Sequence, residues 1–295
     1  MPRPFRFGVN LLTPSPAAEW RATCRRAEEL GYDVILVPDH LGMVAPFPAL
    51  VAAAEATERP RLGTFVLNAG FWNPALLARE VATTDALTGG RLELGLGTGY
   101  VEAEHETAGL PYGSPRERVD HLRHTVRELD RLLGSGEHLP RPAQRRVPLL
   151  IGANGDRMLR LTAEHADIAA FTGARPGRTA GTLEPLTARE LDERVARYQA
   201  HAADRAAQAE LNLLIQIVAV TDDPEPVLRP LLERQPQLTL EEALALPIVL
   251  VGPLDHLVAR LREQRERFGF SYLTVLEPSM EAFAPVLARL REESA

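Results

Sequence analysis

The chain has 295 residues and 45% hydrophobic content, so it can bury either two ordinary cores or one core of barrel size. The formal net charge of −7 has no long block of either sign, so we expect a small-molecule partner, with no nucleic acid and no membrane. Lysine is absent, which excludes a Schiff-base lysine and the lysine of a P-loop.

The cysteine content and the first residues exclude further classes. Cys24 is the only cysteine and lies in an amphipathic helical stretch, so it cannot form a disulfide within the chain, and we interpret it as a packed thiol. We predict no metal site. The opening MPRPFRFGVNLL lacks a long apolar signal segment, and no segment reaches the ~18 apolar residues of a membrane span. We therefore expect a cytoplasmic protein.

Eight strand-like apolar runs recur along the chain, separated by helical patterns. The runs lie at residues 5–12, 32–38, 61–67, 91–97, 147–152, 166–172, 211–221 and 271–277. The helical patterns carry their own end signals, with Gly31 ending the first, Asn73 capping another and Ser114 capping a third. Eight alternating units in this length favour one (β/α)8 TIM barrel over two open sheets, because such a barrel takes about 250 residues. We predict a single barrel domain over residues 1–295, with insertions at about 172–190 and 222–247.

The second run ends in ILVPDHLG, which places Asp39 and His40 directly after a buried strand. Active sites of (β/α)8 barrels lie at the carboxyl ends of the strands, so this pair is a candidate for the catalytic site. His40 can give or take a proton near neutral pH, and Asp39 can orient it or contact a ligand. The simpler interpretation is that Asp39 caps a turn and His40 is a solvated loop residue.

Two glycine-containing strand ends are candidate binding elements. The fourth run ends in LGLGTGY, where Gly95, Gly97 and Gly99 remove side chains at a place where backbone must come close to something. The fifth ends in IGANGDRMLRL, a small-residue turn that enters a helix near Asp156 and could receive a phosphate. The same turn also begins many helices that bind nothing.

The rim of the barrel is the candidate substrate pocket. Phe71 and Trp72 follow the third run, and Tyr100 and His105 follow the fourth. Aromatic walls with few charges favour an organic, largely uncharged or flat conjugated substrate. The insertion at 172–190 is long enough to act as a lid. The alternative for Phe71 and Trp72 is packing at the barrel top or in a dimer contact.

Four stretches together resemble a known family. They are the Asp-His pair after the second run, NPALLAREVATTDALTGGRLELGLGTG at 73–99, PLLIGANGDRMLRLTAEHAD at 148–167, and VLVGPLDHLVARLRE with FGFSYLTV near the end. In this order they resemble the luciferase-like oxidoreductases, and within them the subgroup that uses the deazaflavin coenzyme F420. The resemblance implies a TIM barrel, a cofactor at the carboxyl ends of the strands, and redox chemistry at position five of the cofactor ring.

The resemblance also implies roles for individual residues. Asp39 would lie beside the cofactor ring and His40 near its reactive face, as proton donor or acceptor. A cis peptide bond between Phe65 and Val66 would lie against the back face of the ring. The remaining cofactor-binding residues implied are Asn68 at the ring edge, Thr98 and Gly99 along the cofactor, and Gly152, Ala153 and Asn154, whose backbone amides would hold the phosphate.

Some positions depart from the pattern. F420-dependent sugar-phosphate dehydrogenases have a tryptophan and a glutamate where this chain has Val44 and Tyr100, and the lysine that would grip a sugar phosphate is missing. Glucose 6-phosphate is therefore not the expected substrate. We expect hydride transfer between F420 and a small organic substrate, by a dehydrogenase or a reductase of C=C or C=N bonds, in a homodimer.

Three alternatives stay open. FMN could replace F420, in which case a luciferase-like monooxygenase would be expected. The barrel could bind a flavin without catalysis. LELGLGTGY also resembles the first motif of class I methyltransferases, with Glu93 in the acidic place.

Overall fold

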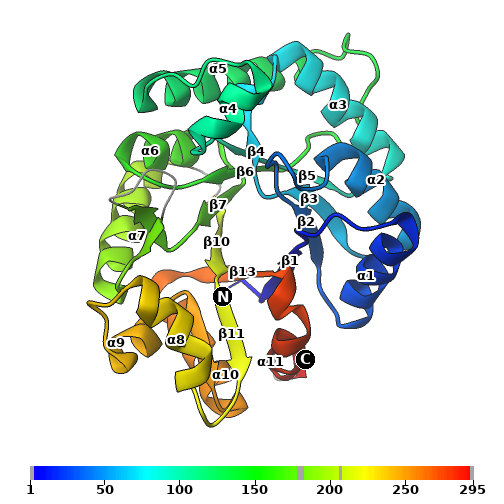
Figure 1. Ribbon diagram of the computed structural model, residues 1–295. Coiled ribbons are helices and arrows are strands. Elements are labelled where there is room, and N and C mark those ends of the chain that lie inside the picture. Colours follow the sequence, from blue (N-terminus) through cyan, green and yellow to red (C-terminus); the bar gives the residue numbers. More distant parts are fainter. Residues whose placement is uncertain (1–2, 178–182, 206–207, 293–295) are drawn as a thin grey trace.

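Parallel strands close into a barrel in the computed structural model, which describes residues 3–177, 183–205 and 208–292 (Figure 1). The barrel strands are β1 (Arg6–Asn10), β2 (Val34–Val37), β3 (Arg61–Thr64) with its short continuation β4 (Leu67–Asn68), β5 (Leu92–Gly97), β6 (Leu149–Gly152), β7 (Ile168–Phe171), β10 (Glu210–Ile215) and β13 (Phe270–Leu276). Their hydrogen-bonded order is β3-β2-β1-β13-β10-β7-β6-β5-β4, and a further β3–β5 pairing closes the ring. The predicted (β/α)8 barrel is confirmed.

Helices surround this barrel (Figure 1). They are α1 (Ala17–Glu29), α2 (Pro46–Ala56), α3 (Pro74–Leu87), α4 (Glu102–Ala108), α5 (Pro115–Gly134), α6 (Asp156–His165), α7 (Ala188–Ala202), α10 (Leu254–Phe268) and α11 (Met280–Glu292), with 3-10 turns η1 (Ala69–Phe71) and η2 (Glu277–Ser279). Asn73 caps α3 by accepting from two backbone amides, and Ser114 forms a capping box at the start of α5. These caps confirm the predicted starts of both helices.

The first insertion forms a small antiparallel hairpin. Its strands are β8 (Ala174–Pro176) and β9 (Leu183–Pro185). The predicted lid at 172–190 therefore includes this hairpin, and its residues 178–182 lie outside the described residues.

The second insertion is larger than the sequence indicated. The run at 211–221, predicted as one strand, divides into β10 and β11 (Ile217–Val220), and β11 pairs in parallel with β12 (Val249–Gly252). Between them lie α8 (Glu225–Arg234) and α9 (Leu240–Ala245). The single-strand prediction was wrong because the chain changes partner after β10: the backbone N–H of Gln216 donates to the Ile248 carbonyl at 2.9 Å, away from the barrel strands. An apolar run cannot reveal such a change of partner.

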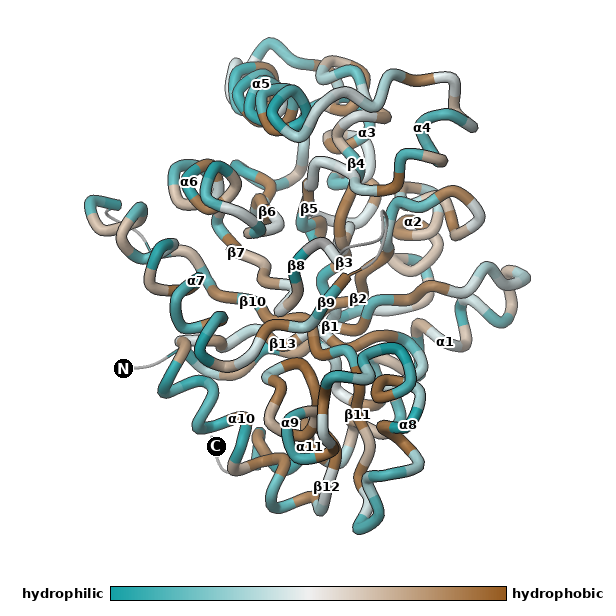
Figure 2. The backbone as a smooth tube through the Cα atoms, turned by 60° about the vertical axis from the view of Figure 1, so that its left-hand side comes forward, coloured by the Kyte–Doolittle hydropathy of each residue, from teal (hydrophilic) through white to brown (hydrophobic). Residues whose placement is uncertain are grey.

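The barrel interior is polar at its amino-terminal end. Arg6 donates two hydrogen bonds to the Glu93 carboxylate, at 2.8 and 2.9 Å, and Arg61 donates a third at 2.6 Å. Arg6 also lies 3.3 Å from Glu210 and stacks over Tyr272. We call this cluster of Arg6, Arg61, Glu93, Glu210 and Tyr272 the barrel plug. Outside the plug the strands are mainly hydrophobic, and the outer helices show long hydrophilic stretches (Figure 2). The core is therefore continuous between strands and helices.

The structure also bears on three smaller expectations. Cys24 is fully buried, and burial raises the pKa of its thiol to about 12, so it is a packed thiol. No helix in the described part of the chain is long and apolar enough to cross a membrane. Glu93 lies on a middle strand of a closed barrel, not on the first strand of an open sheet, so the methyltransferase alternative is wrong.

Candidate active site

Asp39 lies at the exit of β2 and joins two further segments. Its Oδ2 accepts a hydrogen bond from the backbone N–H of Asn68 at 3.1 Å and another from Nε1 of Trp72 at 3.3 Å. Burial raises the pKa of the Asp39 carboxyl, against the opposing effect of these two hydrogen bonds and of nearby His40. Asp39 therefore fixes the exit of β4 to the exit of β2, and it does not cap a turn of its own.

His40 forms a pair that the sequence did not reveal. Its Nδ1 lies 2.9 Å from Oε1 of Glu104 on α4, and the two side chains are only 26% and 15% exposed. The Tyr100 ring meets the imidazole edge-on, with 5.6 Å between centroids. With an Nδ1 proton directed at the carboxylate, Nε2 is the nitrogen left for a ligand.

Glu104 was missed because the sequence VEAEHE offers several acids in a row. Glu102 and Glu106 are exposed, whereas Glu104 is half-buried beside His40. Only the orientation of α4 distinguishes them. One feature of the sequence could have pointed to Glu104. The short helix α4 directly follows the glycines at the end of β5, so one of its side chains had to lie over the strand exits.

The glycines of β5 make room for the irregular third strand. The Phe65–Val66 peptide bond between β3 and β4 is cis, as the resemblance implied. A Cβ at Gly95 would overlap the carbonyl of Thr64, and one at Gly97 would lie 2.7 Å from Val66 Cγ2. The backbone that these glycines approach is therefore that of the neighbouring strand.

Asn68 is held rigidly by hydrogen bonds to both ends of its amide. Its Nδ2 lies 2.9 Å from Nε2 of His105, whose Nδ1 lies 3.0 Å from the Pro111 carbonyl, so an Nδ1 proton leaves Nε2 to accept from Asn68. Asn68 Oδ1 accepts from the backbone of Gly70. A Cβ at Gly99 would overlap the Asn68 amide, and Thr98 beside it is half-buried. Both polar atoms of the Asn68 side chain are thus hydrogen-bonded within the protein.

The four residues predicted for the substrate pocket, Phe71, Trp72, Tyr100 and His105, differ in exposure. His105 is 1% exposed and lies between the rings of Phe71 and Tyr112, so it supports Asn68 and cannot line an open pocket as predicted. Trp72 packs edge-on against Phe47 and binds Asp39, and is half-buried. Tyr100 is 48% exposed beside His40. Of the four, Tyr100 has the most open position.

The turn after β6 was predicted to hold a phosphate through three amides. The Ala153 N–H donates to the Ala170 carbonyl at 2.7 Å, so this amide is not free and its predicted role is wrong. A Cβ added at Gly152 or Gly155 would meet nothing within 4 Å. Helix α6 begins directly afterwards, and no side chain caps it. The space and the uncapped helix start fit a phosphate, for which the first amides of α6 would be available.

Asn154 is oriented by its neighbours. Its Oδ1 accepts from Arg194 on α7 at 2.9 Å, and its Nδ2 donates to the Thr172 hydroxyl at 3.1 Å. Arg194 also donates to the Ala174 carbonyl at 2.8 Å. The turn after β6 is therefore tied to the exit of β7.

Buried polar groups lie beneath the mouth of the barrel. Asn10, the last residue of β1, is 4% exposed, and its Oδ1 has no hydrogen-bond partner among the described residues. By strand alternation its side chain lies on the same face as Arg6, which is inside the barrel. No group of three or more histidine, cysteine or acidic side chains in the described ranges could hold a metal ion. A buried, unpaired amide at this point suits an organic ligand with a donor group.

The closed barrel and the polar side chains at its strand exits define a (β/α)8 barrel protein with a candidate site at the carboxyl end. Residues 3–272 match the profile of the luciferase-like monooxygenase family, and the chain belongs to this family.

Similar proteins include two oxidoreductases, one of them named F420-dependent. The chain is 32% identical over 228 residues to an F420-dependent glucose-6-phosphate dehydrogenase of Nakamurella multipartita, covering 65% of this chain and 66% of that one. It is 27% identical over 182 residues to a 5,10-methylenetetrahydromethanopterin reductase of Archaeoglobus fulgidus, covering 58% and 54%. The matched part thus spans between about a third and two thirds of the length of the curated relatives.

Solved structures share the fold over nearly the whole chain. An F420-dependent secondary alcohol dehydrogenase in complex with an F420-acetone adduct has a TM-score of 0.78 at 15% identity, covering 98% of this chain and 100% of that one. The monooxygenase RslO1 from Streptomyces bottropensis has a TM-score of 0.73 at 21% identity, covering 96% and 99%. Both likenesses establish the fold.

Proposed function

We propose that this protein is an oxidoreductase that binds coenzyme F420 and transfers a hydride between it and a small organic substrate. The observation that carries the proposal is the convergence of Asp39, His40 and Glu104 at the barrel mouth, with Nε2 of His40 left for a ligand. The similar glucose-6-phosphate dehydrogenase of Nakamurella multipartita, which is named F420-dependent, supports the choice of cofactor.

The chain's own residues fit this cofactor. Asn154 and Gly155 before α6, with open space at Gly152, would hold its phosphate, and the segment around the Phe65–Val66 bond would lie at its ring, with Thr98 and Gly99 alongside. When bound, F420 supplies a hydride acceptor or donor at position five of its ring.

His40 would hold or receive the proton that accompanies hydride transfer. Glu104 accepts from Nδ1 and holds the ring, so that Nε2 points to one place. Asp39 fixes the exits of β2 and β4 through Asn68 and Trp72, which keeps the mouth in one shape. Tyr100, exposed beside His40, would contact the substrate, with Phe71 and Trp72 behind it.

A titration with each cofactor tests the proposal. We expect F420 to bind in the micromolar range or tighter, measured by its fluorescence, and FMN to bind more weakly. Turnover is then screened with F420 and alcohols, and with reduced F420 and activated C=C or C=N compounds. Binding without any turnover in either direction would favour the non-catalytic barrel.

A luciferase-like monooxygenase using FMN is the second candidate. The specific observation in its favour is the likeness of the whole barrel to the monooxygenase RslO1. Tighter binding of FMN, with oxygen consumption after its reduction, would reverse the order of the two candidates.

We further propose a homodimer formed through α3. Leu76 and Leu87 on this helix are 51% and 60% exposed and lie three turns apart, so they share one face. Sedimentation of the purified protein tests this assignment. A single domain over the whole chain and a cytoplasmic location stay predictions.

A further inference from the structure

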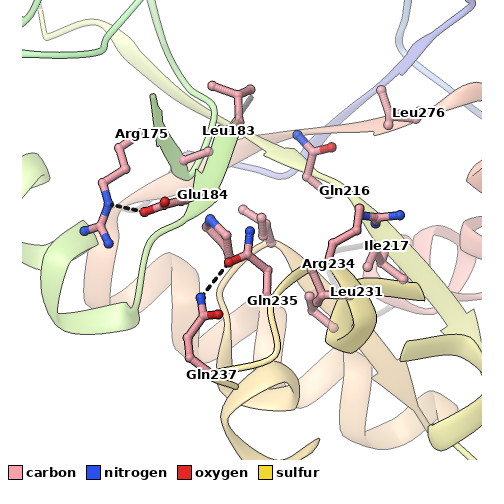
Figure 3. A pocket seen from close by; sticks show the side chains of 14 residues that line it. Arg175, Leu183, Glu184, Gln216, Ile217, Leu231, Arg234, Gln235, Gln237 and Leu276 are labelled. Atoms are coloured by element: carbon pink, nitrogen blue, oxygen red, sulfur yellow. Dashed lines mark hydrogen bonds and ion pairs between the residues drawn. The ribbon is translucent and has the colours of Figure 1, made fainter. Parts of the chain in front are cut away.

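A cavity of about 980 Å³ opens at the carboxyl end of the barrel (Figure 3). Its wall includes Leu276, the last residue of β13, and Gln216, which directly follows β10. The hairpin β8–β9 and helix α8 complete it. Leu276 pairs in register with Asn10 of β1, whose amide oxygen is buried without a partner among the described residues. The cavity therefore borders the mouth in which the proposed cofactor site lies.

Most polar side chains of this cavity are already paired. Arg175 donates to Glu184 at 3.2 Å and also to Glu190. Gln237 donates to Gln235 at 2.6 Å. Arg175 is engaged by two carboxylates and is therefore not a free cation, and Gln235 and Gln237 engage each other, so these side chains form walls more than binding groups.

Arg234 and Gln216 are the exceptions. Neither side chain makes a hydrogen bond or an ion pair with any residue that the structure describes, although both line the cavity. Figure 3 shows them on the side of the cavity opposite the Arg175–Glu184 pair. Arg234 is the last residue of α8, where the helix dipole favours a cation. The exposed guanidinium of Arg234 and the half-buried carboxamide of Gln216, both unpaired among the described residues, therefore line the same cavity.

We propose that this cavity binds the carboxylate of an organic acid substrate through Arg234 and Gln216. The inference rests on the proposed function, which supplies the hydride transfer, and it names the substrate class. A planar guanidinium with a neighbouring amide N–H matches the two oxygens of a carboxylate. The single positive charge matches one negative charge, and a phosphate dianion would require more. The apolar wall formed by Leu231, Ile248 and Leu276 would hold the carbon skeleton.

Binding of a matched acid and amide tests the proposal without any turnover. The probes are 4-phenylbutyrate and 4-phenylbutyramide, and dissociation constants are measured by ligand-observed NMR on the full chain, with and without F420. We expect the acid to bind about tenfold more tightly than the amide, a difference of about 1.4 kcal/mol. Arg234→Gln should remove this preference and leave amide binding unchanged. Gln216→Leu should weaken acid binding by a smaller factor.

Arg229→Gln is the matched control, because Arg229 is exposed on the same helix and does not line the cavity. It should leave both probes unaffected. Equal binding of acid and amide, or equal effects of the two arginine substitutions, would overturn the proposal. Tighter binding of phenyl phosphate than of the acid would overturn the assignment to carboxylates.

The acidic side chain of F420 itself is another source of carboxylates. Titration with F420 and with its tail-free deazaflavin fragment separates the two sources. If Arg234→Gln weakens F420 but not the fragment, and leaves 4-phenylbutyrate unaffected, the arginine serves the cofactor and the proposal fails. Because the acid and amide are first compared in cofactor-free protein, failure of F420 to bind would overturn the proposed function and leave this result standing.

Discussion

Replacement of Glu104 by glutamine tests whether this residue acts through His40. The change keeps the size of the side chain and an acceptor oxygen 2.9 Å from Nδ1, but removes the charge. A charge-assisted hydrogen bond contributes roughly 1.5–3 kcal/mol, against roughly 0.5–1.5 kcal/mol for a neutral one. With side chains 26% and 15% exposed, the pair is largely shielded from water, so most of this difference should persist.

The expected loss is therefore about 1 to 1.5 kcal/mol of transition-state stabilisation, or roughly 5- to 13-fold in kcat. His40→Ala should cost about 10²- to 10⁴-fold, as expected for a general acid or base. The assay is single-turnover hydride transfer, followed by the absorbance of F420 with the substrate that the turnover screen identifies. The dissociation constant of F420 should change little in both variants.

The double variant decides between a coupled and an independent role. If Glu104 works only by holding His40, adding Glu104→Gln to His40→Ala should cause no further loss. Glu106→Gln is the control, since this exposed acid lies on the same helix. Additive losses in the double variant, or equal losses with Glu104→Gln and Glu106→Gln, would refute the reasoning.

Three further predictions concern glycines, the barrel plug and the buried carboxyl. Gly95→Ala should prevent normal folding, because its Cβ would overlap the Thr64 carbonyl, and normal folding of this variant would contradict the reasoning. Gly152→Ala should fold with an unchanged urea midpoint, because its Cβ meets nothing, and should bind F420 less tightly. Glu93→Gln should lower the free energy of unfolding by roughly 3 kcal/mol or more, measured by urea denaturation, because it leaves two arginines without their shared buried carboxylate; a loss under about 1 kcal/mol would show that water serves them equally well. Asp39→Asn should raise Tm at pH 7 while lowering activity. Since burial raises the pKa of the folded carboxyl, the charged form opposes folding above that pKa, and the gain in Tm should fade as the pH falls towards the ordinary carboxyl range; a gain that grows towards low pH would contradict the sign.

The sequence alone was sufficient for the barrel and for its strand exits other than that of the seventh run, which divides into β10 and β11. Buried parallel strands require long apolar runs, and caps such as Asn73 and Ser114 act on their own helices, so both signals are local. The position of Asp39 and His40 also followed from chain order, because the active site of a barrel lies where its strands end. These features depend on residues near one another in the sequence.

The tertiary structure decided which distant groups meet. Glu104 lies 64 positions from His40, and only the orientation of α4 selects it over its acidic neighbours. The unpaired Arg234 became visible only once the fold had placed α8 beside the cavity that Gln216 also lines. The sequence predicted that the backbone N–H of Ala153 would bind a phosphate, yet this group donates to the Ala170 carbonyl of β7. Hydrogen bonding and burial depend on three-dimensional neighbours, and the type of a residue does not reveal whether a neighbour already occupies its polar groups.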